Sequence, residues 1–241
     1  MFRHRGKSRT LQHNLKLASL LSFVAGIVNV SGFFSIQKLT TNVTGHFAYF
    51  ADEVIRGNFS EALVYLLYIF AFFFGAFASG LLVELVSKIN VRFINIIPIT
   101  VEIIILTSIA FFGKDAAVKN ANTIACSLLF AMGLQNALVT SISNSVVRTT
   151  HLTGLFTDLG IELSQIFFYR RPDQLKRLQS SIKLRLVIIS FFFLGCMAGG
   201  YTYLLYGLLS LLPAAVILVF GLMYDNLKIR MVLFKRKYIH L

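Results

Sequence analysis

The chain has 241 residues, of which 56% are hydrophobic and only 14% charged, and its mean hydropathy is +0.75. An average soluble domain is about 45–50% apolar and about 25% charged. The composition therefore excludes a disordered chain, a coiled coil, a collagen-like fibre and a disulfide-stapled domain. It indicates an all-α polytopic membrane protein, with residues 1–241 forming a single membrane domain.

The formal net charge is +13, from 23 Lys and Arg against 10 Asp and Glu. The basic residues stand in short clusters between apolar runs, and no basic stretch is long enough to follow a phosphate backbone. They are typical of topology signals and contacts to lipid headgroups, so we expect no nucleic-acid partner. Cys126 and Cys196 lie in apolar segments, and the sequence predicts neither a metal site nor a cofactor.

Six apolar runs have the roughly 20 residues that a membrane-spanning helix needs. The predicted spans are residues 17–36, 62–86, 93–112, 123–143, 184–206 and 208–224.

Basic residues concentrate in alternate connections. They define the predicted inner segments as residues 1–16, 87–92, 146–183 and 225–241. The outer connections keep only Lys38, Arg56, Lys114 and Lys119. The charge asymmetry predicts that the basic N-terminus (1–16) and the basic tail (225–241) are both cytoplasmic.

Two segments do not fit six simple spans. Residues 40–60 and 149–169 each begin with threonines and continue as a short apolar run that carries carboxylates. In the second, Asp158, Glu162 and Gln165 fall on one helical face. We predict half-helices or re-entrant segments, with interfacial helices as the alternative.

The two halves of the chain match in the same order at four places. The matches are 26–29 with 133–136, 40–45 with 149–154, 75–80 with 195–200, and 96–98 with 211–213. They divide the chain into repeat one, residues 17–113, and repeat two, residues 121–224. Each repeat has three predicted spans, so the second copy must be inverted in the bilayer. Inverted repeats with broken helices are typical of secondary transporters, which bind substrate near the midplane.

The Thr-Thr-x-x-Thr-Gly motif occurs once in each repeat and is the main candidate for substrate binding. Its residues are Thr40, Thr41, Thr44 and Gly45, and Thr149, Thr150, Thr153 and Gly154. Thr44 and Thr153 are predicted to cap a helix whose N-terminus could attract an anion. The alternative is that the threonines only cap and bond back to carbonyls. Asn29, Gln135 and Asn136 are polar residues within spans, either facing a cavity or bonding to a neighbouring helix.

Carboxylates near these motifs are candidates for ion coupling. Glu53 and Glu162 occupy equivalent positions of the two repeats, and Asp158 precedes Glu162 by one turn. The alternative is a solvated face of an interfacial helix. Glu102 lies in the middle of a predicted span and is a secondary candidate.

Several of these residues carry a resemblance to a known family. Residues 132–137 (MGLQNA), 148–154 (RTTHLTG) and 157–159 (TDL), with Gly26-x-x-Asn29-x-x-Gly32-Phe33, resemble the signature of the YoaK-like family. That family comprises bacterial inner-membrane proteins and is classed as a domain of unknown function. The resemblance implies a bacterial inner membrane and about six spans, and it implies no substrate.

The chain departs from that family at two positions. Asn29 stands where the family often has Asp, and His46 where it often has Asn. If that Asp carries a proton elsewhere in the family, repeat one has lost that carrier.

The resulting functional prediction is a small secondary transporter or channel-like carrier of a small solute, with an anionic solute favoured. The alternative is a scaffold, sensor or assembly factor that presents the basic 169–185 segment and the tail. An enzyme is not expected, because no His-Glu-x-x-His, Gly-x-Ser-x-Gly or Walker motif is present. The predicted partners are the lipid bilayer and a small solute, with a second copy of the chain as a candidate.

Overall fold

The structure is a computed structural model that describes residues 9–90 and 93–224, and in these residues the chain forms helices and no strand. The predicted tail (225–241) and the first half of the predicted N-terminus (1–8) lie outside the described residues.

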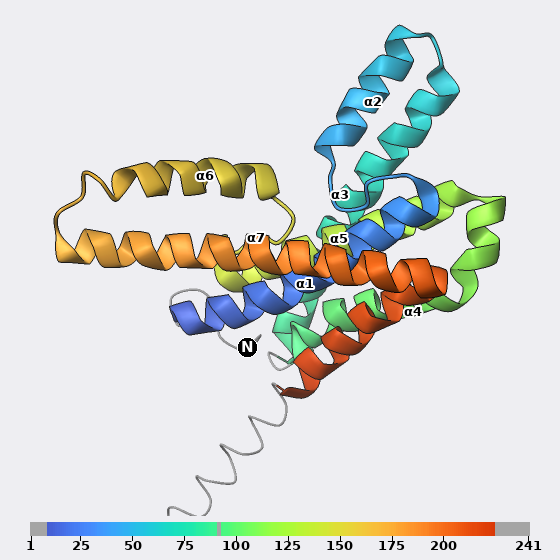
Figure 1. The fold of residues 1–241 in the computed structure, drawn as a ribbon. Coiled ribbons are helices and arrows are strands. Elements are labelled where there is room, and N and C mark those ends of the chain that lie inside the picture. The colour runs from blue at the N-terminus through green and yellow to red at the C-terminus, as the bar shows by residue number, and fades with distance from the viewer. Residues whose placement is uncertain (1–8, 91–92, 225–241) are drawn as a thin grey trace, which may run out of the picture.

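The described chain consists of long helices, with short helices inserted after α1, α5 and α7 (Figure 1). The long helices are α1 (Leu11–Ile36), α3 (Phe59–Ile89), α4 (Ile96–Lys119), α5 (Ala121–Ser143) and α7 (Pro172–Tyr206). The short ones are α2 (Thr44–Ile55), α6 (Leu152–Gln165) and the 3-10 helix η3 (Gly207–Ser210). Residues 211–224 are again α-helical.

Among the described residues, five segments are long and apolar enough to cross a membrane, so the protein is a polytopic helical membrane protein. They are Leu11–Ile36, Phe59–Ile89, Ile96–Lys114, Ala121–Ser143 and Pro172–Tyr224. The last contains both predicted spans 184–206 and 208–224. At its 3-10 helix Gly207 has a φ of +59°, a conformation that suits glycine, and the chain reverses its direction there (Figure 1).

The predicted inner segment 146–183 is not a plain loop, contrary to a simple count of spans. It contains α6 and the first twelve residues of α7. The helix α7 therefore extends well before the apolar part that begins at residue 184, and α6 folds back along it (Figure 1). On the opposite side of the molecule, α2 folds in the same way along the start of α3 (Figure 1).

Two close helix pairs hold the bundle together, α1 with α7 and α3 with α5. Small residues at the crossings bring the backbones into contact. A Cβ on Gly26 would overlap the carbonyl oxygen of Phe192, and one on Gly75 would overlap that of Phe130. Each pair joins a helix of predicted repeat one to a helix of predicted repeat two.

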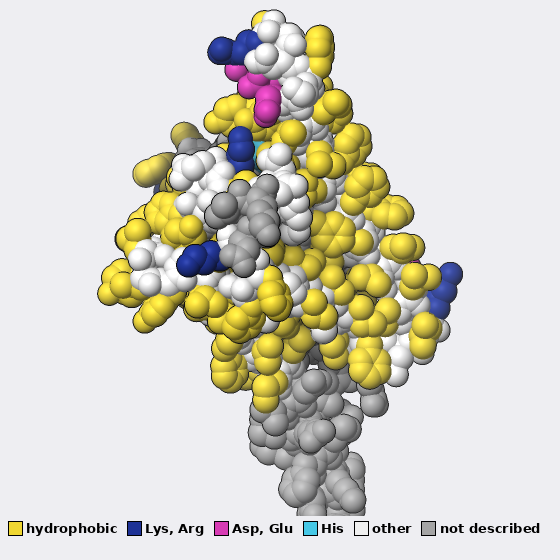
Figure 2. Space-filling model, turned by 90° about the vertical axis from the view of Figure 1, so that its right-hand side faces the viewer, with side chains coloured by type: hydrophobic (Ala, Val, Ile, Leu, Met, Phe, Trp, Pro, Cys, Tyr) yellow, Lys and Arg dark blue, Asp and Glu magenta, His cyan; other side chains and the backbone are white. Residues whose placement is uncertain are grey.

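The surface agrees with a lipid environment. Hydrophobic side chains cover most of the face in Figure 2, and the acidic side chains in view gather at the tip formed by α2 and α3. The outward face of α3 includes Phe70, Phe73, Phe74 and Phe77, all exposed. Exposed aromatic residues in such number would be unfavourable in water, but not in contact with lipid.

Candidate functional site

The threonine motifs fold back onto the preceding long helix. Thr41 Oγ1 donates to Asn29 Oδ1 at 2.7 Å, and Asn136 Nδ2 donates to Thr150 Oγ1 at 2.8 Å. Each asparagine lies seven residues before the end of its helix, which is about 10 Å at 1.5 Å per residue. Both connecting loops therefore enter the bundle before α2 and α6 begin.

The capping role predicted for Thr44 and Thr153 is wrong. The helix α2 begins at Thr44 itself, and Asn42 Oδ1 accepts the N–H of Gly45 at 3.2 Å. The N-cap of α6 is His151, and it makes no side-chain cap bond. Both threonines are exposed, because each helix starts earlier than the motif suggests.

Buried polar atoms without a hydrogen-bond partner gather around the second motif. Gln135 is 1% exposed and donates from Nε2 to the carbonyl of Leu21 at 3.0 Å, while its Oε1 has no partner. Asn136 Oδ1 and Thr149 Oγ1 are also unpaired. In repeat one, by contrast, Thr40 Oγ1 donates to the carbonyl of Val28. Unpaired buried polar groups cost free energy, about 1–3 kcal/mol each, unless water or a ligand reaches them.

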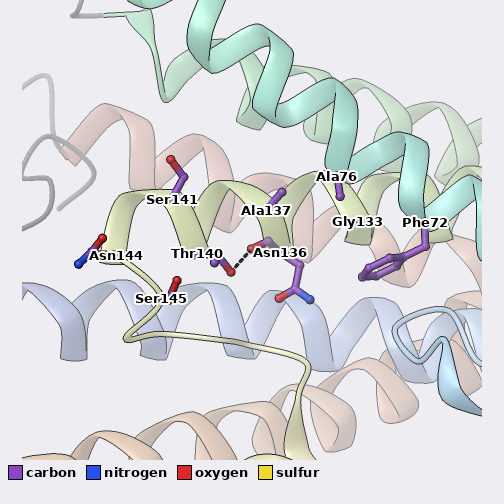
Figure 3. A pocket seen from close by; sticks show the side chains of 9 residues that line it. All are labelled: Phe72, Ala76, Gly133, Asn136, Ala137, Thr140, Ser141, Asn144 and Ser145. Atoms are coloured by element: carbon purple, nitrogen blue, oxygen red, sulfur yellow. Dashed lines mark hydrogen bonds between the residues drawn. The ribbon is translucent and has the colours of Figure 1, made fainter.

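A shallow, open cavity of about 550 Å³ lies beside the contact of α5 with α3 (Figure 3). Its lining residues are Phe72 and Ala76 of α3, and Gly133, Asn136, Ala137, Thr140, Ser141, Asn144 and Ser145. Gly133 lies at the middle of α5, whereas Asn144 and Ser145 follow its end. The cavity, named here the α3–α5 cavity, therefore leads from mid-helix depth toward the end of α5.

A second cavity of about 750 Å³ lies between the start of α1, α6 and α7, and is named here the α6–α7 cavity. Its polar lining residues are Asn14, Ser145, Arg148, His151, Asp158, Ser180, Ser181 and Arg185, with Gly154 of the threonine motif. Its apolar lining residues are Leu11, Val146, Leu155, Leu184 and Ile188. Ser145 lines both cavities, so they adjoin at the same end of the bundle.

Arg185 is the centre of the charges in the α6–α7 cavity. Glu162 accepts from both N–H groups of one guanidinium edge, Nε to Oε2 at 2.9 Å and Nη2 to Oε1 at 3.0 Å. Ser181 Oγ also donates to Glu162 Oε1, at 2.6 Å. The remaining nitrogen, Nη1, lies 2.8 Å from Asp158 Oδ2. Asp158 and Glu162 thus share one face of α6, as predicted.

An aromatic cluster occupies the equivalent place in the other half. It comprises His46 and Tyr49 of α2 and Tyr65 and Tyr68 of α3, with ring centroids 5.1–6.2 Å apart. His46 Nε2 donates to the carbonyl of Leu39 at 2.8 Å, and Lys38 lies over the ring of Tyr65 at 4.8 Å. Burial lowers the pKa of His46, an effect that the hydrogen bond to Leu39 partly offsets and the charge of Lys38 reinforces.

The other predicted carboxylates lie apart from these cavities. Glu53 accepts from Asn58 Nδ2 at 2.9 Å at the tip of α2. Glu102 is completely buried in α4, and neither of its oxygens has a hydrogen-bond partner. In the part of the chain that the structure describes, no three His, Cys, Asp or Glu residues lie close enough to hold a metal ion.

The structure therefore divides the predicted site. Asn136, Gly154 and Asp158 line the cavities, whereas Asn29, Thr40, Thr41 and Gly45 belong to the other, filled half. Arg185 is not among the residues that the sequence pattern predicts for the site. An arginine one helix after two carboxylates at i, i+4 spacing was the available signal.

Comparison with known proteins gives a family and no named function. No significant match was found among curated proteins or among solved structures. One family model, described as a protein of unknown function, covers residues 17–224. That match confirms the predicted membership of a domain-of-unknown-function family, and it spans nearly all of the helical region. The chain belongs to the DUF1275 family of proteins of unknown function.

Proposed function

We propose that this protein is a small secondary transporter or channel-like carrier, built from two inverted repeats of three spans in a bacterial inner membrane. The observation that carries the proposal is the pair of adjoining polar cavities, because helices of both repeats line them. A polar path from mid-helix depth to one end of a membrane bundle is what a solute needs.

The glycine contacts support the inverted repeat. Gly26 meets the carbonyl of Phe192, and Gly133, its counterpart in the sequence match, meets that of Phe72. Gly75 meets the carbonyl of Phe130, and its counterpart Gly195 meets that of Phe23. In all four contacts the phenylalanine lies three residues before the matching glycine of its own helix. Exchanging the two predicted repeats therefore converts each contact into one of the others.

The loop geometry supports the same symmetry. The helices α1 and α5 both end with a residue in the left-handed conformation, Gln37 at φ 54° and Asn144 at φ 55°. These two residues occupy the same position when Asn29 is aligned on Asn136. The threonine–asparagine bonds follow in each half. The turn at Gly207 then separates a fifth and a sixth span.

The charges support an inward-facing position for both cavities. Arg148 lines the α6–α7 cavity just before α6 begins, and Arg170 and Arg171 lie beyond the other end of α6, so basic residues flank α6 at the end of the bundle that carries it. The positive-inside rule places this end, and the start of α1, in the cytoplasm. A solute would enter there and reach Gln135, Asn136 and the second threonine motif. Glu102, buried without a partner, is then the carboxylate best suited to carry a proton or cation.

The test uses the purified full-length chain in two steps. Thermal shift in neutral detergent with sodium acetate, succinate, phosphate and sulfate, and with neutral amino acids, identifies a bound solute. A ligand at about 100 times its Kd stabilises the folded state by about 2.7 kcal/mol. The radiolabelled form of that solute is then used in counterflow into phosphatidylcholine proteoliposomes. We expect accumulation that Thr150→Val reduces, because the Asn136 amide loses its acceptor.

The matched control is Thr157→Val, since the Thr157 hydroxyl only donates to the carbonyl of Thr153 on its own helix. A solute that binds but never accumulates would support the sensor or scaffold alternative instead. No stabilisation by any solute would also count against a carrier.

Access from the cytoplasm is tested separately in membrane vesicles. In a chain with Cys126 and Cys196 replaced by alanine, Ser141→Cys should react with an impermeant maleimide in inside-out vesicles, because Ser141 lines the α3–α5 cavity. Phe34→Cys, at the equivalent position of the other half, should react only in right-side-out vesicles. Equal labelling of both cysteines from one side would contradict the inverted topology.

A further inference from the structure

We propose that Arg185 Nη1 binds an oxyanion of a small soluble solute, a carboxylate or a phosphate, in the α6–α7 cavity, and that Asp158 occupies this position until the solute displaces it. The proposal specifies the solute class of the carrier proposed above and therefore rests on it, but its test measures binding and not flux.

The two carboxylates on Arg185 differ in how firmly they are held. Glu162 is 14% exposed, accepts two guanidinium N–H groups and also accepts the Ser181 hydroxyl. Glu162 therefore fixes the plane of the guanidinium and leaves Nη1 facing away from Glu162, toward Asp158. Asp158 meets that edge through a single oxygen and is 51% exposed. An exposed ion pair contributes little to stability, so an incoming anion can replace Asp158 far more easily than Glu162.

The cavity offers further groups suited to an anion. Arg148 lines it, is exposed, and has no ion-pair partner in the part of the chain that the structure describes. Gly154 also lines it, in the first turn of α6, where backbone N–H groups without intrahelical partners favour negative charge. Asn14 of α1 also lines the cavity. Asp158, a carboxylate of the chain itself, shows that Nη1 can bind a carboxylate oxygen.

Displacement of Asp158 would also weaken the attachment of α6 to α7. Asp158 and Glu162 are the two residues that join α6 to Arg185 of α7 by ion pairs. Once a solute takes the place of Asp158, Glu162 and the contact of Leu159 with Leu178 and Ile182 keep α6 on α7, and only the turn of α6 before Asp158 is released. Solute binding and opening of the α6–α7 cavity are then linked through one guanidinium.

The experiment is thermal denaturation of the full-length chain in neutral detergent, with titrations of sodium succinate and of sodium phosphate against sodium chloride at equal ionic strength. We expect at least one oxyanion to raise Tm above the chloride control. Asp158→Asn should lower the apparent Kd of that oxyanion by about tenfold, because the competing carboxylate is removed. The matched control is Asp52→Asn, which breaks the exposed Asp52–Arg56 pair of α2 and should leave the Kd unchanged.

Arg185→Gln should abolish the oxyanion effect. Because this variant leaves Glu162 unpaired, Glu162→Gln/Arg185→Gln is measured beside it, and Asp158→Asn tests the proposal even if neither folds. An oxyanion effect of equal size in the wild type, Asp158→Asn and Arg185→Gln would overturn the proposal, as would a weaker affinity in Asp158→Asn.

A lipid phosphate has the same chemistry, and a second arm distinguishes it from a soluble anion. The titration is repeated in nanodiscs of phosphatidylcholine alone and of phosphatidylcholine with phosphatidylglycerol. We expect succinate or phosphate to stabilise the protein in phosphatidylcholine alone. Stabilisation by phosphatidylglycerol with none by either soluble anion would overturn the proposal in favour of a headgroup site. If oxyanion binding follows the variants but counterflow fails, the binding site stands and only the carrier function is lost.

Discussion

The hairpins α2–α3 and α6–α7 occupy equivalent positions of the two predicted repeats, yet one is filled and the other is hollow. When Thr44 is aligned on Thr153, and Gly75 on Gly195, Tyr49 corresponds to Asp158 and Tyr65 to Arg185. In the first hairpin the pair is a ring stack with centroids 5.2 Å apart. In the second it is an ion pair at 2.8 Å.

The same alignment matches His46 with Leu155 and Tyr68 with Ile188. All four residues of the second hairpin line the α6–α7 cavity, whereas their four aromatic counterparts pack against one another. The comparison teaches that side-chain size and chemistry, placed on similar helical hairpins, decide which half of the molecule holds a cavity. The difference between the two hairpins therefore follows from the side chains at matching positions. Four predictions test it.

The largest effect is expected at the glycine crossings that both halves share. Gly75→Ala places a Cβ against the Phe130 carbonyl and should destabilise the fold by about 3 kcal/mol, since overpacking that cannot relax is costly. Gly195→Ala should behave alike, because it meets the Phe23 carbonyl. The measurement is Tm in detergent. Gly80→Ala in α3 is the control, with nothing near its Cβ, and an equal loss there would contradict the packing argument.

The next effect comes from emptying the filled half. Tyr68→Ile gives the first hairpin the residue of the second and should cost about 2 kcal/mol, because Tyr68 is completely buried and its hydroxyl donates to Asn122. Tm measurements would show the loss. The variant Tyr49→Phe, at an exposed ring of the same cluster, should change little. A Tyr68→Ile protein as stable as the wild type would mean that the cluster does not support α3.

Lowering the pH should reduce stability by a smaller amount, through His46 of the same aromatic cluster. The pKa of His46 is lowered in the folded state, so the unfolded chain binds more protons near its ordinary value of about 6.5. Stability contributed by neutral His46 is therefore full above that value and falls as the pH is lowered through it. Tm between pH 7.5 and 5.5 should decrease more in the wild type than in His46→Leu. Identical pH profiles would refute the assignment.

The smallest effect on stability is expected from filling the hollow half. Ile188→Phe adds a ring beside the α6–α7 cavity and should cost about 1 kcal/mol, because Ile188 is completely buried and only its cavity side leaves room. It should nevertheless weaken the oxyanion-dependent rise in Tm, for the space beside Arg185 is reduced. Leu186→Phe, on a more exposed part of the same helix, is the control. Retained oxyanion binding in Ile188→Phe would place the site elsewhere.

Part of the site could be read from the sequence and part could not. The threonine motifs, Asn29 and Asn136 were singled out from their repetition, and each threonine loop does bond to its asparagine. The capping role of Thr44 and Thr153 was wrong, because a shift of one or two residues in a helix start changes which side chain reaches the free N–H groups. Arg185 was missed, since its partners lie 23 and 27 residues away.

The sequence by itself determined the features that depend on local chemistry. A run of about 20 apolar residues is long enough to cross a bilayer, so the polytopic helical class followed from composition and length alone. The order of the repeated motifs likewise needed no coordinates. Only the tertiary structure decided that α6 and the start of α7 form a hairpin, that Glu162 orients Arg185, and that one hairpin is hollow. Those features depend on which side chains meet across separate helices, and that is fixed by how the helices pack, through contacts such as Gly26 on Phe192 and Gly75 on Phe130.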